Sequence, residues 1–392
     1  MKNCLIYFKL FLLIPIILLL CIIRIFIDFR ISKIISHKIG HLTFPMEIYI
    51  CEKKDDPEKV PVIWFFDKII SNEFIKKKWS KKLLILPRLI LEPIHILFRK
   101  YKLFDIFLID YSKELDVVKR SIKNGVKHID NNNVLLKYKP SIEFNYKENN
   151  DGESYLRKIG FNNEKFFAFS SRTSEFHFET SYSSRNSNIY DKILGVKSLV
   201  SKGYKSIRMG KDEKKLNFND SNIIDYASSI DRSDFLDVYL ASKCEFMISD
   251  NSGINELAAL FRKPRLIVNE YEVHNLDRRF SKSIILLKKI KNSNTGKFIS
   301  FEEAYKKKLN LIDSTIELNK LGYEIIDNNE FEIKEALESM LDLIKNRLSL
   351  DEVLKNQKNY WQNLEKYFEV KNNNKTIICP NFYSNNINLF EL

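Results

Sequence analysis

Residues 248–256 read Ile248-Ser249-Asp250-Asn251-Ser252-Gly253-Ile254-Asn255-Glu256. Residues 245–249 predict a strand, the polar residues after it a loop, and residues 254–261 a helix. A helix N-terminus fed directly by a strand offers free backbone N–H groups and the positive end of the helix dipole to an anionic group such as a diphosphate. The alternative is an ordinary capping loop, in which Asp250 or Ser252 satisfies the helix end.

The side chains of this loop suggest how a ligand would be held. Ser252 and Gly253 are small and let the backbone come close to a ligand. Glu256 falls one turn into the helix, where its carboxylate can accept hydrogen bonds from ribose or sugar hydroxyls. Together with Asn251, these three residues are our candidates in this loop for ligand binding.

Predicted strands and helices also alternate along the chain before and after this loop. Strands are expected at residues 165–170, 206–208, 223–226 and 264–269, and helices at 189–202 and 235–243. Strands that alternate with helices indicate a parallel sheet with crossover helices. We therefore predict an α/β fold, and the 392 residues allow two Rossmann-like domains.

The domain limits follow from composition. Residues 30–42 predict a first strand opening into a Gly-bearing loop, and residues 60–66 and 104–109 predict two further strands. Residues 131–153 are polar and rich in turn formers, which indicates a boundary. We expect an N-terminal domain over residues 30–150, a second domain over 151–350, and a C-terminal helix and polar tail over 351–392.

A membrane anchor is expected over residues 1–29. Leu10 to Ile23 is an uninterrupted apolar run of 14 residues, and Leu5 to Ile27 is long enough to span if Lys9 and Arg24 snorkel. A cleaved signal peptide is the alternative, but no small-residue cleavage site follows the run. The excess of basic residues after the run favours a body on the cytoplasmic side.

Residues 74–102 combine a Lys-rich start around Trp79 with a long apolar stretch. One interpretation is a buried helix with a solvated start. The other is an interfacial segment with Trp79 at the lipid headgroups and lysines facing anionic lipid. Pro87 and Pro93 argue against one long helix there.

The charge is unevenly spread. The net charge is +13, and residues 1–150 carry 27 basic and 16 acidic residues. Such a basic half attracts anionic lipid or nucleic acid, but it adjoins an apolar run and lacks interleaved stacking aromatics, so nucleic-acid binding is the weakest interpretation. The five cysteines are scattered, odd in number and without CxxC spacing, which argues against a disulfide framework or a zinc site.

Residues 248–264 are similar to the donor-site element of GT-B sugar transferases such as the heptosyltransferases. Residues 160–270 also resemble a family of glycosyltransferases from bacterial surface-polysaccharide gene clusters. The matching motifs are Arg172, Tyr182, Arg185-Asn186, Gly203-Tyr204, Arg208-Met209-Gly210, Ile224-Asp225-Tyr226-Ala227, Arg232-Ser233-Asp234-Phe235 with Asp237, and Ser252-Gly253. Residues 38–42 and 378–382 match that family as well. The resemblance implies a GT-B fold, with the acceptor in the N-terminal domain and the nucleotide-sugar donor in the second.

Arg172 and Arg208 each stand at the carboxyl end of an expected strand, where doubly wound sheets bind ligands. Two guanidinium groups there can grip a diphosphate and stabilise it as the leaving group. Structural ion pairs with Asp225, Asp231 or Asp234 are the alternative. Asp225 and Tyr226 are candidates for holding the ribose and base, and the alternative is a strand-end Asp that caps the next helix. Gly210 belongs to the same donor-binding set.

The general base that deprotonates the acceptor hydroxyl is expected in the first loop. His41 is our candidate because it titrates near neutrality. Glu47, Glu175 and His177 are alternatives, and a satisfied core histidine is the other interpretation of His41.

We therefore predict a glycosyltransferase that moves a sugar from a nucleotide-sugar to a lipid-linked or surface-glycan acceptor at the inner (cytoplasmic) membrane, with its catalytic body facing the cytoplasm. No DxD-like motif stands in a matching place, so the reaction is expected to need neither a metal nor a cofactor besides the nucleotide-sugar co-substrate. Two alternatives stay open: a nucleotide-sugar epimerase, and a non-catalytic membrane-associated adaptor with the same fold.

Overall fold

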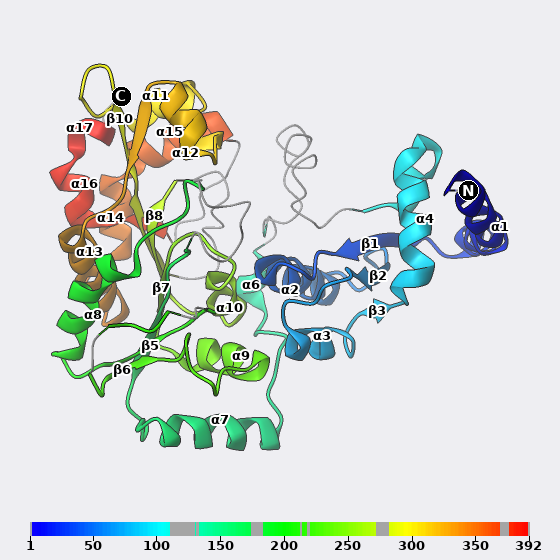
Figure 1. Cartoon of the computed structure of the whole chain (residues 1–392), viewed down its shortest axis with the longest axis horizontal. Helices are drawn as coiled ribbons and strands as arrows, with labels where there is room; N and C mark the ends of the chain where they lie inside the picture. Colours follow the sequence, from blue (N-terminus) through cyan, green and yellow to red (C-terminus); the bar gives the residue numbers. More distant parts are fainter. Residues whose placement is uncertain are drawn as a thin grey trace. The chain divides into compact units, whose positions relative to one another are not determined.

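The computed structural model describes residues 2–109, 130, 133–173, 183–211, 214–217, 220–271, 282–368 and 376–390. The chain divides into two compact units, Met1–Val134 and Leu135–Leu392. Both units are built on parallel sheets with helices between the strands (Figure 1).

The sheet of the first unit has the order β1-β2-β3, and its neighbouring strands are parallel. Its strands are β1 (Arg30–Ile34), β2 (Val62–Phe66) and β3 (Leu84–Ile85). β1 and β2 confirm two expected strands. Residues 104–109 are different, because most of them form the 3-10 helix η1 (Lys102–Phe107) and only Leu108 makes a bridge, to Ile31. The Phe104 and Phe107 rings pack 4.5 and 5.0 Å from that of Phe98, and this cluster favours a helical turn over a strand.

The helices of the first unit are α1 (Lys2–Phe26), α2 (Ile39–Asp55), α3 (Glu73–Trp79) and α4 (Arg88–Lys100). The expected Gly-bearing loop after β1 is wrong, since α2 already includes Gly40 and His41. For Trp79 the structure favours the first of the two interpretations of residues 74–102, a buried position. Its ring is fully buried, and its indole N–H donates to the Leu42 carbonyl at 2.7 Å.

In the part of the chain that the structure describes, no helix combines the length and the apolar character needed to cross a membrane. The spanning anchor expected over residues 1–29 therefore has no support from these residues.

The second unit contains a seven-stranded sheet in which every neighbouring pair is parallel. Its order is β12-β9-β8-β7-β4-β5-β6. The strands are β4 (Phe166–Phe169), β5 (Lys205–Arg208), β6 (Ile223–Asp225), β7 (Met247–Ser249), β8 (Arg265–Glu270), β9 (Ser283–Leu287) and β12 (Thr376–Ile378). The chain runs outward from β4 through β5 and β6, and then returns to the other side of β4 with β7. This is the strand order of doubly wound nucleotide-binding sheets, so the Rossmann-like prediction is confirmed for this unit.

Helices cover both faces of this sheet (Figure 1). On one face, α8 (Ile193–Val200) and α13 (Glu330–Ile344) share a buried core with Phe167 and Phe169 of β4. A Cβ atom on Gly195 would come within 2.3 Å of a Leu337 methyl group and 3.0 Å of the Lys334 backbone, so the close approach of α8 and α13 requires glycine. On the other face lie α9 (Asp234–Lys243) and α10 (Asn255–Leu260).

The remaining elements surround this core. They are α6 (Val134–Lys137), α7 (Tyr146–Lys158), η4 (Ile189–Lys192), β10 (Lys289–Asn292), α11 (Phe301–Lys306), η6 (Leu309–Leu311), α12 (Thr315–Lys320), β11 (Tyr323–Ile326), α14 (Leu350–Asn356), α15 (Lys358–Phe368), α16 (Pro380–Asn385) and α17 (Ile387–Phe390). β10 and β11 form a separate antiparallel pair.

Part of the 351–392 segment was expected to be a polar tail, but residues 376–390 form a strand and two short helices. β12 adds an edge strand parallel to β9, and the Gln357 side chain exchanges two 2.8 Å hydrogen bonds with the Ile378 backbone. Residues 376–390 therefore pack against the second unit's core.

Candidate functional site

The direction of the strand order reverses between β4 and β7, which pair through Phe169 and Ile248. The loops that follow these two strands, residues 170–172 and 250–253, leave the same edge of the sheet. Ligands of doubly wound sheets bind at this edge, at the point where the strand order reverses. We call these two loops the switch-point loops.

Asp250 joins the switch-point loops. Its carboxylate accepts a hydrogen bond from the Arg172 backbone N–H at 2.8 Å and from the Ser187 hydroxyl at 2.7 Å. Its other oxygen lies 3.0 Å from the Lys192 ammonium nitrogen, and both side chains of this ion pair are fully buried. Lys192 also donates to the Ser171 hydroxyl at 2.5 Å. Asp250 therefore holds the loops together and does not cap α10, whose first turn has no side-chain cap.

The edge of the sheet at this point carries buried polar atoms that make no hydrogen bond within the described residues. They are the hydroxyls of Ser170, Ser249 and Ser252 and the side-chain oxygen of Asn255. Ser170 and Ser249 directly follow the paired residues of β4 and β7. Because nearly all buried polar groups in proteins have a partner, such a group of atoms at a sheet's binding edge indicates a place for a polar ligand.

Arg172 lies half-buried in the first switch-point loop. Its backbone is fixed at both ends, because its N–H donates to Asp250 and its carbonyl accepts from the Ser187 N–H at 3.0 Å. The structure therefore brings Arg172 and the 250–253 loop together, as the sequence analysis expected.

The other predicted residues lie in the second switch-point loop and in the first turn of α10. The Asn251 amide donates to the Glu270 carboxylate of β8 at 3.3 Å. The carbonyls of Ser252 and Gly253 accept from the N–H groups of Asn255 and Glu256 at 3.1 and 3.2 Å. Glu256 is half-buried in the first turn of α10.

Arg208 and Asp225 form a structural pair. Arg208 is 4% exposed, and one guanidinium nitrogen lies 3.2 Å from both carboxylate oxygens of Asp225 and donates to the Lys214 carbonyl at 2.8 Å. Asp225 also accepts from the Leu216 N–H and the Ser228 hydroxyl, each at 2.8 Å. The structure thus contains the ion pair that the sequence analysis gave as the alternative for Arg208, and this pair secures the loop between β5 and β6. The donor-binding roles of Arg208 and Asp225 stay predictions.

Tyr226 is a core residue rather than a stacking platform for a base. Its ring is fully buried and its hydroxyl lies 2.9 Å from the Asp237 carboxylate. Burial raises the pKa of Tyr226 well above its ordinary value, and the Asp237 charge adds to this. Burial also raises the pKa of Asp237 to about 6, although the Arg232 guanidinium 2.6 Å away opposes the shift.

Gly210 has a backbone role. Its φ of +117° favours glycine, and its carbonyl accepts from the Arg232 side chain at 2.9 Å. This contact ties the start of the β5–β6 loop to the region before α9, so Gly210 shapes the loop instead of contributing a side chain.

The first unit presents a histidine that the sequence analysis did not select. His37 follows β1 and Asp67 follows β2, and the His37 Nδ1 lies 2.8 Å from an Asp67 oxygen. The His37 side chain is 38% exposed. When Nδ1–H donates to the carboxylate, Nε2 is left as the basic nitrogen. His41, the predicted base, lies half-buried in the first turn of α2.

The ionisation state of Asp67 favours its hydrogen bond with His37. Burial acts to raise its pKa, but hydrogen bonds from the Lys68 N–H and His37 and the charge of Lys33 outweigh burial, so the pKa of Asp67 lies below its ordinary value. The carboxylate is therefore ionised at neutral pH. Among the alternative bases, Glu47 is fully buried in α2, and Glu175 and His177 lie outside the described residues.

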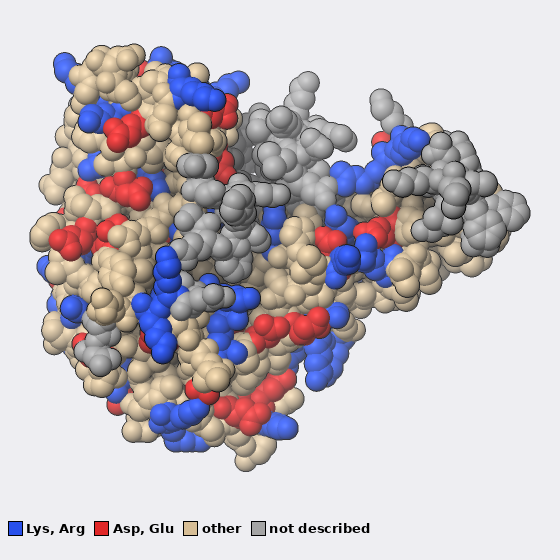
Figure 2. All heavy atoms as spheres, in the orientation of Figure 1, with Lys and Arg blue, Asp and Glu red and all other residues tan. Residues whose placement is uncertain are grey.

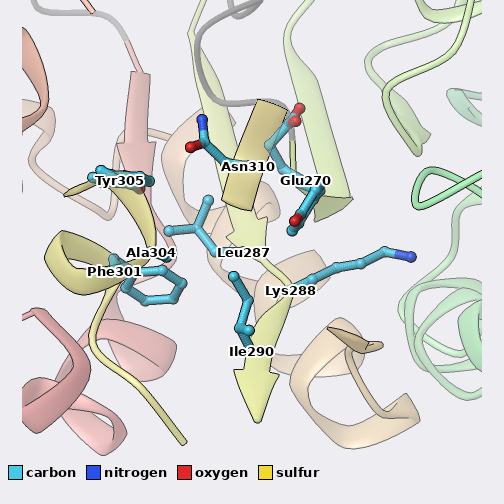
Figure 3. Close-up of a pocket in the computed structure, with 9 residues that line it drawn as sticks. Glu270, Leu287, Lys288, Ile290, Phe301, Ala304, Tyr305 and Asn310 are labelled. Atoms are coloured by element: carbon cyan, nitrogen blue, oxygen red, sulfur yellow. The ribbon is translucent and has the colours of Figure 1, made fainter. Parts of the chain in front are cut away.

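A small cavity lies beside β8 and β9, and Glu270, the acceptor of the Asn251 amide, is one of the residues that line it. Its volume is about 10 Å³, which is the size of one water molecule. Figure 3 shows Asn310 beside Glu270, with Lys288 extending away from them. This cavity is too small for a nucleotide, and we do not assign the donor to it.

No family model and no curated protein sequence matches this chain. Solved structures similar to it include a glycosyl transferase family 9 protein from Veillonella parvula, at 10% identity over 80% of this chain and 97% of that chain, with a TM-score of 0.46. Another is E. coli ADP-heptose lipopolysaccharide heptosyltransferase II, at 14% identity over 61% and 84% of the two chains, with a TM-score of 0.37. A third is S. aureus MnaA with UDP, at 13% identity over 81% and 96%, with a TM-score of 0.33.

Proposed function

We propose that this protein is a glycosyltransferase that binds a nucleotide-sugar at the switch-point loops of its second unit. The observation that carries the proposal is the cluster of buried hydroxyl and amide atoms at the reversal of the strand order, beside the half-buried Arg172. A diphosphate supplies the acceptors and a sugar supplies the hydroxyls that such groups bind.

In the proposed reaction, an acceptor hydroxyl attacks the anomeric carbon of the donor sugar. The bond between that carbon and the diphosphate oxygen breaks, and the nucleoside diphosphate leaves with the bonding electrons. Arg172 stabilises the charge that develops on the leaving group. We propose that this reaction proceeds without a metal ion.

The proton of the acceptor hydroxyl goes to a general base. We propose His37 for this role, because Asp67 accepts from its Nδ1–H and leaves Nε2 to take the proton. Asp67 is a positioning residue here, since it fixes the tautomer and stabilises the imidazolium that forms.

We further propose a lipid-linked or surface-glycan acceptor at the cytoplasmic face of the inner membrane. The support is the basic excess of residues 1–150, which attracts anionic lipids and phosphate-bearing acceptors.

Replacing Arg172 by Ala is expected to weaken binding of the cognate nucleotide-sugar about 10- to 100-fold, the effect of losing one charged hydrogen-bonding group. Calorimetry with a panel of uridine, adenosine, guanosine and cytidine nucleotide-sugars measures the affinities. Arg157→Ala is the matched control, because Arg157 is 58% exposed on α7 and pairs only loosely, at 3.8 Å, with Glu153.

Equal affinities of the wild type and Arg172→Ala for every nucleotide-sugar would remove Arg172 from the site. Product analysis of the same mixtures separates the alternatives. Isomerised sugar without transfer indicates an epimerase, and tight nucleotide binding without turnover in the presence of membrane extracts indicates an adaptor.

A further inference from the structure

The described part of α1 is apolar on two faces. One face packs on the core of the first unit through Leu13, Ile16, Ile17, Leu20 and Cys21. The opposite face is open: Phe26 is 81% and Ile25 78% exposed. Ile14, Leu18, Leu19 and Ile22 belong to the same open face. Since a helix that is apolar all round is normally buried on all sides, the open face of α1 indicates a missing partner.

The helix α4 also has one buried apolar face and one exposed apolar face. Its inner face is buried through Leu91, Ile94, His95 and Phe98. On its outer face Leu89 is 87% and Ile96 62% exposed. Leu84, Leu86 and Ile90 just before and within the helix are exposed too. Large apolar side chains exposed together mark an interaction surface.

The two open faces belong to one body. α1 and α4 pack on the same cluster of core residues, which includes Phe65 and Phe107, and Figure 1 shows the two helices next to each other. We call the exposed apolar residues of α1, β3 and α4 the apolar faces of the first unit.

The charges around α4 identify the partner. Between residues 77 and 101, every exposed charged residue is basic: Lys77, Lys81, Lys82, Arg99 and Lys100. Just outside this range, Glu73 of α3 is exposed and pairs with Lys76 at 3.0 Å, and Asp105 of η1 is exposed. Figure 2 shows basic side chains over α3 and at one end of α4. The acidic residue of this range, Glu92, is half-buried and paired with Arg88. Tyr101 is 48% exposed beside Lys100, whose ammonium lies 5.5 Å from its ring, an arrangement typical of the membrane–water boundary.

We propose that the apolar faces seat the first unit in the surface of an anionic lipid bilayer, with Leu89, Ile96 and the open side of α1 among the acyl chains and the basic residues at the headgroups. Apolar area and attraction to anionic lipid add together in this mode of binding. A second copy of the chain fits less well, because a symmetric contact would bring like charges together. The proposal rests on the first unit alone, so it stands or falls independently of the donor site.

The test is flotation of the purified full-length chain with vesicles of phosphatidylcholine, with or without phosphatidylglycerol. The wild type is expected to float with the mixed vesicles, and less so at high salt, because salt screens the lysines. The double variant Leu89→Asp/Ile96→Asp is expected to lose on the order of tenfold in partition coefficient for each side chain. Ile230→Asp is the matched control, because Ile230 is 99% exposed in the second unit, and it is expected to float like the wild type.

One further double variant and a mass measurement complete the test. Lys81→Glu/Lys82→Glu is expected to reduce flotation with mixed vesicles and to leave the weak binding to phosphatidylcholine unchanged. Circular dichroism of each variant shows whether the chain is folded. A folded Leu89→Asp/Ile96→Asp chain that floats like the wild type would overturn the proposal. So would light scattering that shows a lipid-free wild-type dimer which this variant turns into a monomer, because the faces would then bind a second copy.

Discussion

Replacing Asp250 by Ala is expected to lower the melting temperature of the second unit by on the order of 10 °C, because removing one partner of a buried ion pair costs about 3–5 kcal/mol. The change leaves the Lys192 ammonium in a fully buried position without its carboxylate. It also removes the acceptor of the Arg172 N–H and the Ser187 hydroxyl, so the switch-point loops lose their junction. Nucleotide-sugar binding is expected to fall together with stability.

Thermal unfolding followed by circular dichroism measures this effect. Asp342→Ala is the control, since Asp342 is 48% exposed and lies 3.7 Å from an exposed arginine, and exposed pairs contribute at most about 1 kcal/mol. The double variant Lys192→Met/Asp250→Leu is expected to recover part of the loss, because it leaves no buried charge unpaired. A melting temperature of Asp250→Ala equal to that of Asp342→Ala would contradict the buried pair.

Replacing His37 by Ala is expected to lower kcat by about 10²- to 10⁴-fold, the usual contribution of a general base. Nucleotide-sugar affinity should stay unchanged, because the donor groups lie in the second unit. Steady-state kinetics with the cognate donor gives kcat, and calorimetry gives the affinity. Asp67→Asn should lower kcat as well, and by less, because the imidazole remains but its tautomer is no longer fixed.

His41→Ala is the matched control, since it removes the other candidate base. A loss of kcat in His41→Ala with normal turnover in His37→Ala would return the role to His41.

The hydrogen bond between His37 and Asp67 also affects how the stability of the protein depends on pH. The pKa of Asp67 lies below its ordinary value, so its contribution to stability is fully present above the ordinary value of 3.8 and is lost as the pH falls through the lowered value. His37→Ala removes one cause of that lowering, so part of this acid-sensitive stability should disappear.

The fold of the second unit could be predicted because its strands and helices alternate in strongly apolar and polar segments. Residues 245–261 show this best, and β7 and α10 lie where the pattern placed them. β12 could not be found in this way, since three residues in a polar region carry no periodicity. Its position depends on Gln357, which bonds the Ile378 backbone from elsewhere in the chain.

The candidate site could be predicted in part. Arg172 and the 250–253 loop come together because β4 and β7 are neighbours. The sequence analysis gave the pairing of Arg208 with Asp225 only as an alternative. These two residues end neighbouring strands in register, so their charges neutralise each other. The Lys192–Asp250 pair was missed because a lysine in residues 189–200 reads as a solvated side chain. His37 and Asp67 both follow strands of one parallel sheet, and that signal was present in the sequence.

Hydrogen exchange of the full chain with and without its cognate nucleotide-sugar tests the central claim most directly. Amides in residues 170–172 and 249–256 are expected to be protected by the ligand, while those lining the small cavity beside β9 are unchanged. Protection confined to other segments, with the switch-point loops exchanging at the same rate in both samples, would contradict a donor site at the reversal of the strand order.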